Sequence, residues 1–251
     1  MVTLSFKKPI ILTRVNADNK EFVQTFSELY PNIDVNQSFR FLSFFEIVLE
    51  RKPKEKLHLD YLICTSRYAI QAIPSSENVV NKYMFCVGKS TALAAMERGF
   101  DKVFYPEVGN ASNLAKLISL KVGDKNSNLH YLRGKEVSYD LKLELEKFGY
   151  KVHETIVYRQ KKLKLAGKIR NSLTKEDVGG VIFFSANVAK NFCHYFKKFP
   201  EDFLFFCISD RVAQEVLKTQ VQDDYKIRVA SEPTTREIMK LVYHEEVVRQ
   251  H

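Results

Sequence analysis

Hydroxyl-bearing and basic side chains recur at one kind of place in this sequence, directly after short apolar runs. Leu12-Thr13-Arg14 is one example, and Cys64-Thr65-Ser66-Arg67 is another. Hydroxyls, guanidinium groups and the free N–H groups at a helix N-terminus all bind carboxylates and other anions. The candidate ligands of such an anion are Arg14, Thr65, Ser66, Arg67, Gly88, Lys89, Ser90, Thr91, Arg133, Ser185, Ser209 and Thr234.

Other chemistries have little support in the motifs. A single Ser or Thr at such a place is also an ordinary helix N-cap, but its recurrence through both halves of the chain favours a ligand site. The sequence has no GxGxxG, no GxSxG and no His pair with metal-ligand spacing, and Gly88-Lys89-Ser90 lacks the upstream glycine of a P-loop. The motifs therefore predict no Rossmann dinucleotide site, no P-loop and no metal site.

The apolar runs that carry these residues are predicted to be parallel strands, each followed by a helix of about ten to fifteen residues. Such alternation predicts parallel sheets covered by helices on both faces, with ligands beyond the carboxyl ends of the strands. The predicted strands are Pro9–Arg14, Asp60–Ser66, Tyr83–Gly88, Lys102–Tyr105, His130–Gly134, Gly180–Ser185, Phe203–Ser209 and Ile227–Ala230.

An internal repeat decides the predicted domain organisation. Shifting the chain by about 120 residues places Tyr61–Ser66 on Gly180–Ser185 and Cys86–Ala92 on Cys207–Ala213. Ile11–Arg14 meets Tyr131–Gly134 in the same way, so the two halves are interleaved in the sequence.

The fold predicted from this repeat is α/β, with two doubly wound parallel-sheet domains joined by a two-stranded antiparallel linker. One domain is discontinuous, formed by residues 1–32 and 165–251, and the other spans residues 42–150. The alternating stretches 33–41 and 151–164 are the predicted linker strands, with Tyr158 near the end of the second. The aromatic segment Phe39–Leu49 fits a strand, a helix or both.

Bulk composition is that of a soluble globular protein, with 251 residues and a formal net charge of +9. The charge suits an anionic partner, which could be nucleic acid, an acidic surface or a polycarboxylate metabolite. The four cysteines form no CxxC pair, which favours reduced structural thiols in a cytoplasmic protein. No apolar leader or long apolar span is present, so we expect neither a signal peptide nor a membrane helix.

Several of these motifs, in their order and spacing, resemble the uroporphyrinogen-III synthase family along nearly the whole chain. The motifs are Leu12-Thr13-Arg14, Cys64-Thr65-Ser66, Val87–Ala92 with Gly99, Leu132-Arg133-Gly134, Val157-Tyr158, Phe183-Phe184-Ser185 and Pro233-Thr234. The resemblance implies two α/β domains joined by a two-stranded linker, with a cofactor-free active site in the cleft between them.

The resemblance also implies a reaction and a substrate. Hydroxymethylbilane, a linear tetrapyrrole, loses water and closes to uroporphyrinogen III, its last pyrrole ring inverted through a spiro intermediate. The family's best candidate for the proton donor corresponds to Tyr158. The resemblance thus implies a cyclising lyase of haem biosynthesis, and we further expect a monomer that receives substrate from the preceding enzyme.

The chain departs from the family after the strand at Phe205–Ile208, where Gly and then Thr-Thr-Ala are usual. Here the segment is Ser209-Asp210-Arg211-Val212-Ala213, which puts substrate contacts from this loop in doubt. The alternative function is a non-catalytic two-domain module that binds an anionic, polycarboxylate ligand. A nucleic-acid-binding protein is the third hypothesis; the scattered lysines and strand-embedded aromatics do not favour it.

Overall fold

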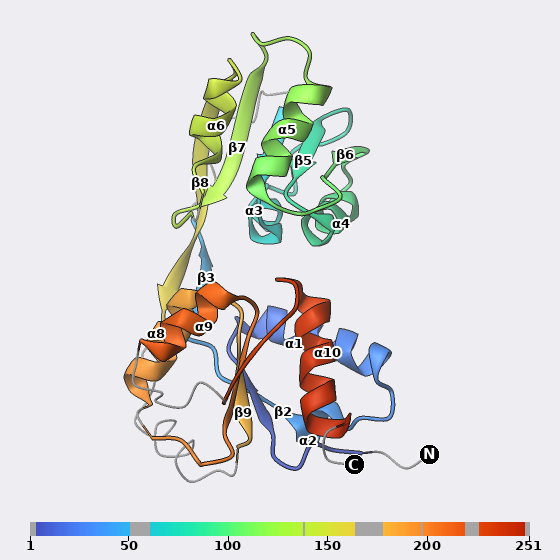
Figure 1. Ribbon diagram of the computed structural model, residues 1–251. Coiled ribbons are helices and arrows are strands. Elements are labelled where there is room, and N and C mark those ends of the chain that lie inside the picture. The colour runs from blue at the N-terminus through green and yellow to red at the C-terminus, as the bar shows by residue number, and fades with distance from the viewer. Residues whose placement is uncertain are drawn as a thin grey trace. The chain divides into compact units, whose positions relative to one another are not determined.

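The chain divides into two compact units, each of which is an α/β structure (Figure 1). The computed structural model describes residues 4–50, 61–137, 139–163, 178–196, 198–218 and 226–248. Unit 1 consists of Met1–Glu46 with Lys162–His251, and unit 2 of Ile47–Lys161. Each unit contains a sheet of mainly parallel strands with helices against it, which confirms the predicted fold class.

Unit 1 is built on a five-stranded parallel sheet of order β11-β10-β9-β1-β2. Its strands are β1 (Ile10–Leu12), β2 (Phe39–Phe41), β9 (Gly180–Phe183), β10 (Leu204–Cys207) and β11 (Ile227–Val229). Its helices are α1 (Asn16–Leu29), α2 (Val35–Ser38), α8 (Ala186–Tyr195), α9 (Asp210–Leu217) and α10 (Thr235–Tyr243), and a π-helical turn, η2 (His244–Val248), follows the last.

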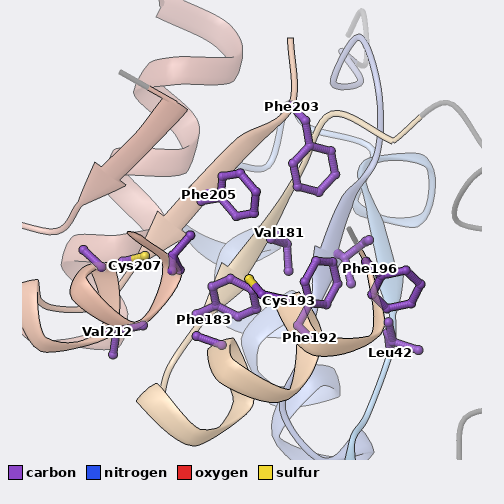
Figure 2. Packing of buried hydrophobic residues seen from close by; sticks show 14 of the residues in the cluster. Leu42, Val181, Phe183, Phe192, Cys193, Phe196, Phe203, Phe205, Cys207 and Val212 are labelled. Atoms are coloured by element: carbon purple, nitrogen blue, oxygen red, sulfur yellow. The ribbon is translucent and has the colours of Figure 1, made fainter. Parts of the chain in front are cut away.

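Both faces of this sheet are buried, which is why its strands are apolar without alternation. On one face, shown in Figure 2, Phe183 and Phe205 of the strands pack with Phe192 of α8 and Val212 of α9. On the other face the neighbouring strand residues, such as Ile182, pack against α1 and α10.

Unit 2 carries a six-stranded sheet of order β3-β8-β7-β4-β5-β6. Its strands are β3 (Phe45–Leu49), β4 (Tyr61–Cys64), β5 (Tyr83–Cys86), β6 (Lys102–Phe104), β7 (Asn128–Gly134) and β8 (Lys151–Lys162). Its helices are α3 (Arg67–Gln71), α4 (Lys89–Glu97), α5 (Ala111–Lys121) and α6 (Leu141–Lys147). One buried cluster joins the sheet to α3 and α4, and another joins its opposite face to α5 and α6.

The two sheets share one strand order once the chain is permuted. In unit 1, β9 and β1 are central neighbours, with β10 and β11 on one side and β2 on the other. In unit 2, β4 and β7 are neighbours in the same way, with β5 and β6 on one side and β8 on the other. The pairs β1/β7, β9/β4 and β10/β5 are those that the sequence repeat superposes, so the repeat corresponds to a real structural equivalence.

The predicted first linker strand, residues 33–41, is wrong. Asp34 accepts hydrogen bonds from the backbone N–H groups of Asn36 and Gln37, and it caps the short helix α2. Phe39–Phe41 then forms β2, paired in parallel with β1 inside unit 1. The alternation of apolar and polar residues in Ile33–Asn36 therefore comes from a helix cap and the start of α2, and not from a strand.

The segment Phe39–Leu49 contains two strands, β2 and β3. β3 is the neighbour of β8, and the pairing runs antiparallel. The N–H of Glu50 donates to the Val157 carbonyl and the N–H of Leu163 to the Phe44 carbonyl, both at 2.9 Å. β8 ends at Lys162; residue 164, the predicted end of the second linker strand, and residues 165–177 lie outside the described part. No helix of the described residues is long and apolar enough to cross a membrane.

Candidate active site

The carboxyl ends of β4, β5 and β7 lie at one edge of the unit 2 sheet, because these strands are parallel. β4 leads into Thr65 and Ser66, and β5 into Gly88. β7 ends in Arg133 and Gly134, and Tyr158 pairs with Gly134 from β8. The structure thus brings the predicted unit 2 residues to one edge.

Two of the hydroxyls at this edge are held by local hydrogen bonds. The Thr65 Oγ1 lies 2.9 Å from the hydroxyl oxygen of Tyr131, a residue of β7 that is only 3% exposed. The Ser66 Oγ accepts from the backbone N–H of Tyr68 and caps α3. Ser66 is therefore an ordinary helix N-cap, which was the alternative interpretation of such a serine. Its own O–H is still able to donate a hydrogen bond.

A β-bulge turns Tyr158 toward these groups. Arg133 is paired with Ile156, but Gly134 is paired with Tyr158, so Val157 is an extra residue on β8. Val157 and Tyr158 consequently pack on the same side of the sheet, in the cluster that covers α3 and α4. Val152, which regular alternation would place on the side of Tyr158, packs on the opposite face.

The Tyr158 hydroxyl keeps its proton at neutral pH. Burial raises the pKa of Tyr158 above its ordinary value of 10.0, a hydrogen bond with Ser66 partly offsets this, and the nearby Cys64 and Glu136 raise it further. The pKa of Tyr131 is also raised, chiefly by burial. Each phenol can therefore donate a hydrogen bond, and Tyr158 is half-buried where Tyr131 is fully buried.

The two arginines at this edge have different surroundings. The Arg133 guanidinium pairs with Glu154, with Nε 2.8 Å from Oε1, and also donates to the carbonyls of Gly134 and Lys135. Arg67 lies over the ring of Tyr68 at 5.6 Å, and that ring is 5.9 Å from the ring of Tyr158. The ring of Tyr68 thus contacts both Arg67 and Tyr158, whereas Arg133 stabilises the β7–β8 pair.

Helix α4 offers backbone N–H groups at the same edge. Its N-cap is Gly88, which brings no side chain to cap the helix, and Lys89 and Ser90 of the first turn are exposed. The first N–H groups of a helix have no partner inside it, and they attract anions together with the helix dipole. Thr91 differs from its neighbours because it is 6% exposed and packs inward.

In unit 1, Arg14 follows β1 beside two residues that were not predicted. Its backbone N–H donates to the Oδ1 of Asn19, and the Asn19 Nδ2 donates to the Arg14 carbonyl at 2.8 Å. Ser43 donates to the same carbonyl. The guanidinium lies 3.3 Å from Asp18 and 4.8 Å from the centre of the Phe184 ring.

The remaining unit 1 candidates begin helices at the carboxyl ends of β9, β10 and β11. Ser185 caps α8 by accepting from the N–H of Val188, and Thr234 caps α10 by accepting from that of Glu237. Ser209 is the N-cap residue of α9, but its side chain makes no capping hydrogen bond within the described structure. α9 and α4, which follow the equivalent strands β10 and β5, thus both begin without a side-chain cap.

Sequence reasoning missed Tyr131, Tyr68, Asn19 and Ser43. Tyr131 and Tyr68 look like apolar residues of a strand and a helix, and their neighbours depend on strand pairing. Asn19, 0% exposed within α1, is a polar residue at a core position, and that pattern was the only available signal. All four cysteines are free and buried, and the described residues contain no group of three or more His, Cys, Asp or Glu that could hold a metal ion.

Comparison with known proteins identifies the family. A family model described as uroporphyrinogen-III synthase HemD matches residues 41–240, which is most of the chain. The chain belongs to the uroporphyrinogen-III synthase family. No curated protein sequence matches it.

Solved structures of uroporphyrinogen-III synthases share the fold. The enzyme from Helicobacter pylori 26695 superposes with a TM-score of 0.67 at 18% identity, over 95% of this chain and 99% of that one. A mutant of the enzyme from the extremely thermophilic bacterium Thermus thermophilus gives a TM-score of 0.50 at 13% identity, over 96% and 99% of the two chains. The resemblance read from the sequence motifs is therefore confirmed.

Family membership makes the chain a cyclising lyase of haem biosynthesis, a uroporphyrinogen-III synthase. None of these comparisons favours the non-catalytic binding module. The cleft between the two carboxyl edges remains a prediction, as do the roles of the individual site residues.

The departure from the synthase pattern at Ser209–Val212 has a structural explanation. Val212 is the third residue of α9, as Thr91 is of α4, and both side chains are buried. Val212 packs in the core with Phe183 and Phe192 (Figure 2). A hydroxyl there would face apolar groups, so a valine suits this position. Asp210 lies in the first turn of α9, where a negative charge complements the helix dipole.

Proposed function

We propose that this synthase uses the hydroxyl of Tyr158 to protonate the leaving hydroxyl of hydroxymethylbilane. The observation that carries the proposal is the half-buried, protonated Tyr158 hydroxyl, which the bulge in β8 directs toward Ser66 at the carboxyl edge of unit 2. Fixed next to the hydroxymethyl group, a weak acid of this kind assists C–O cleavage without releasing its proton to solvent beforehand.

The proposed step balances as follows. Tyr158 gives its proton to the hydroxymethyl oxygen. The C–O bond then breaks, water departs, and an azafulvene cation remains on the first pyrrole. The substituted α-carbon of the last pyrrole attacks this cation and forms a spiro intermediate. The bond from that carbon to its original methylene bridge then breaks, which gives a second azafulvene cation on the neighbouring pyrrole. The free α-carbon of the last pyrrole attacks this second cation and closes the ring in inverted orientation. The proton that the pyrrole carbon loses as the ring regains aromaticity restores the phenol, so no cofactor is consumed.

The substrate's acetate and propionate groups are proposed to bind at helix N-termini and basic side chains. In unit 2 these are the first turn of α4, with Lys89 and Ser90, and the guanidinium of Arg67. In unit 1 they are Arg14 and the start of α9 at Ser209. The net charge of +9 favours association with a polycarboxylate in general.

The proposal includes a monomer in the cytoplasm that receives the bilane from the preceding enzyme of the pathway. Support for the compartment comes from the four free cysteines, whose buried thiols suit a reducing environment. Burial raises the pKa of Cys86 and Cys207 to about 12, which makes these two thiols poor nucleophiles.

Product isomer analysis tests the function. Hydroxymethylbilane is generated in situ with the protein present, the products are oxidised, and the uroporphyrin isomers are separated by chromatography. The bilane closes unaided to isomer I, so we expect isomer III to dominate only with active protein. Isomer I alone, from folded protein, would refute the synthase activity.

Tyr158→Phe tests the proton donor. We expect turnover to isomer III to fall about 10²-fold, the size typical of a lost general acid, with little change in KM. Tyr61→Phe is the matched control, because Tyr61 lies at the start of β4, the opposite end of the strand from the site. Equal turnover in Tyr158→Phe and Tyr61→Phe would show that Tyr158 is not the donor.

A further inference from the structure

The ring of Tyr158 lies directly against the backbone of its cross-strand partner, Gly134. A Cβ built on Gly134 would lie 2.7 Å from the Cζ, 2.8 Å from the Cε2 and 2.9 Å from the hydroxyl oxygen of Tyr158. Non-bonded carbon atoms normally approach to about 3.5–4.0 Å. No side chain fits between β7 and the phenol in this arrangement.

The requirement for glycine at this position is steric and not conformational. Among the described glycines only Gly99 and Gly149 have the positive φ that other residues avoid, so the backbone of Gly134 is open to any residue. The bulge at Val157 is what brings the ring over Gly134, because it pairs Gly134 with Tyr158 instead of Val157. The bulge therefore determines on which side of the sheet the Tyr158 ring lies, and the glycine allows the ring to lie directly against the backbone of β7.

We propose that Gly134 is a positioning residue for the proton donor, whose missing side chain lets the Tyr158 hydroxyl reach Ser66 at the carboxyl edge. This inference rests on the proposed function of Tyr158 and extends it to a residue that does not touch the substrate. Aromatic rings also cover strand glycines for stability alone, and that explanation predicts no specific effect on catalysis.

Gly134→Ala is the direct test, with Gly123→Ala as matched control, since a Cβ on Gly123 meets no atom within 4 Å. We expect turnover to isomer III to fall about 10²-fold in Gly134→Ala, the cost of displacing a reacting group by roughly an ångström. In a Tyr158→Phe background the same substitution should change turnover by less than about twofold, because the hydroxyl that it displaces is already absent. Equal losses in both backgrounds would overturn the proposal.

A spectroscopic measurement separates positioning from general destabilisation. In protein labelled with ¹³C at tyrosine Cζ, the Tyr158 signal is assigned by its loss in Tyr158→Phe and titrated with pH. Burial is the main cause of the raised pKa of Tyr158, and Ser66, Cys64 and Glu136 are the groups around it. We expect Gly134→Ala to lower this pKa toward its ordinary value and Gly123→Ala to leave it unchanged. An unchanged titration in folded Gly134→Ala would also overturn the proposal.

Thermal unfolding keeps the test decisive if Gly134→Ala folds poorly. Leucine at position 158 lacks the outer ring atoms that the new Cβ would meet, so Gly134→Ala should lower the Tm of the wild type and leave that of Tyr158→Leu nearly unchanged. An equal drop in both proteins would show that the ring is not what Gly134 accommodates. A wild-type protein that forms only isomer I would refute the proposed function, while the titration and Tm comparisons would still decide the role of Gly134.

Discussion

Two tyrosine hydroxyls lie at the carboxyl edge of unit 2, and their different surroundings suit them to different roles. Tyr131 is 3% exposed and is engaged with Thr65 at 2.9 Å. Tyr158 is half-buried and hydrogen-bonded to Ser66. Since both phenols remain protonated, exposure to substrate distinguishes them. Tyr158 is the one suited to give up a proton, and Tyr131 is suited to fix Thr65.

Glu246 gives the fold a specific dependence on pH. It is 8% exposed on η2 and lines a cavity of about 400 Å³ with Lys7, Asp202 and Glu245, at the amino ends of the unit 1 strands. Burial, then Glu245 and then Asp202, raise its pKa from 4.5 to about 7. The folded state therefore holds a proton that the unfolded state has lost between about pH 4.5 and 7.

We accordingly expect stability to fall as pH rises through this window, by at most about 3 kcal/mol, and to level off above about pH 7. Glu246→Gln should remove most of this slope, because the amide stays neutral. Thermal unfolding between pH 5 and 8 measures it, with Glu97→Gln, an exposed residue of α4, as control. The same slope in wild type and Glu246→Gln would contradict the assignment.

At the scale of elements, some candidate residues cap a helix with their side chain, and others begin a helix that has no side-chain cap. Ser66, Ser185 and Thr234 use their oxygens to cap α3, α8 and α10. α4 and α9 have no such side-chain bond within the part of the chain described. In α9 the Val212 N–H donates to the Ser209 carbonyl and Asp210 adds a negative charge, so α4 has the more open N-terminus for an anion. The start of α4 is thus the better anion-binding element of the two, through its backbone N–H groups together with Lys89.

Val212→Thr tests this distinction by restoring the hydroxyl usual in the family. Because Val212 is 3% exposed among apolar residues, the added hydroxyl should destabilise the protein by about 1–3 kcal/mol without raising kcat/KM. Arg211→Thr, on the exposed side of the same turn, is the control and should change stability by less than about 0.5 kcal/mol. A gain in kcat/KM with Val212→Thr would mean that this side chain reaches the substrate.

The sequence predicted elements well where local signals decide them. Leu62–Cys64 and Val181–Phe183 are continuous apolar runs, and both belong to strands buried on two faces. Ile33–Asn36 failed because its alternation coincides with a cap at Asp34. The side of the sheet taken by Tyr158 could not be predicted, because the bulge at Val157 exists only in the pairing of β8 with β7. Site residues were found where they follow strands, and partners such as Tyr131, which meets Thr65 from another strand, were missed because tertiary contacts select them.

At the scale of the molecule, the two units repeat one strand order in permuted form. The chain completes β1 and β2 of unit 1, builds unit 2 as a continuous segment, and returns to add β9, β10 and β11. Each unit has apolar clusters on both faces of its own sheet. A unit that buries both faces with its own helices has the main requirement for independent folding.

Excising each unit tests this independence. The Leu163 N–H lies 2.9 Å from the Phe44 carbonyl, so replacing Phe45–Lys162 by a two-residue Asn-Gly turn should close a β-hairpin between these two residues and keep the rest of unit 1 intact. Ile47–Lys161 expressed alone should fold as unit 2. Circular dichroism and cooperative thermal unfolding measure both fragments, and neither should form isomer III, since each keeps only one carboxyl edge. The control is the fragment of residues 47–121, which lacks β7 and β8. It should not fold, because β4 loses its partner β7 and one side of this central strand is left unpaired. If Ile47–Lys161 behaves like that control, unit 2 depends on contacts with unit 1, and the two sheets form a single folding unit despite their separate cores.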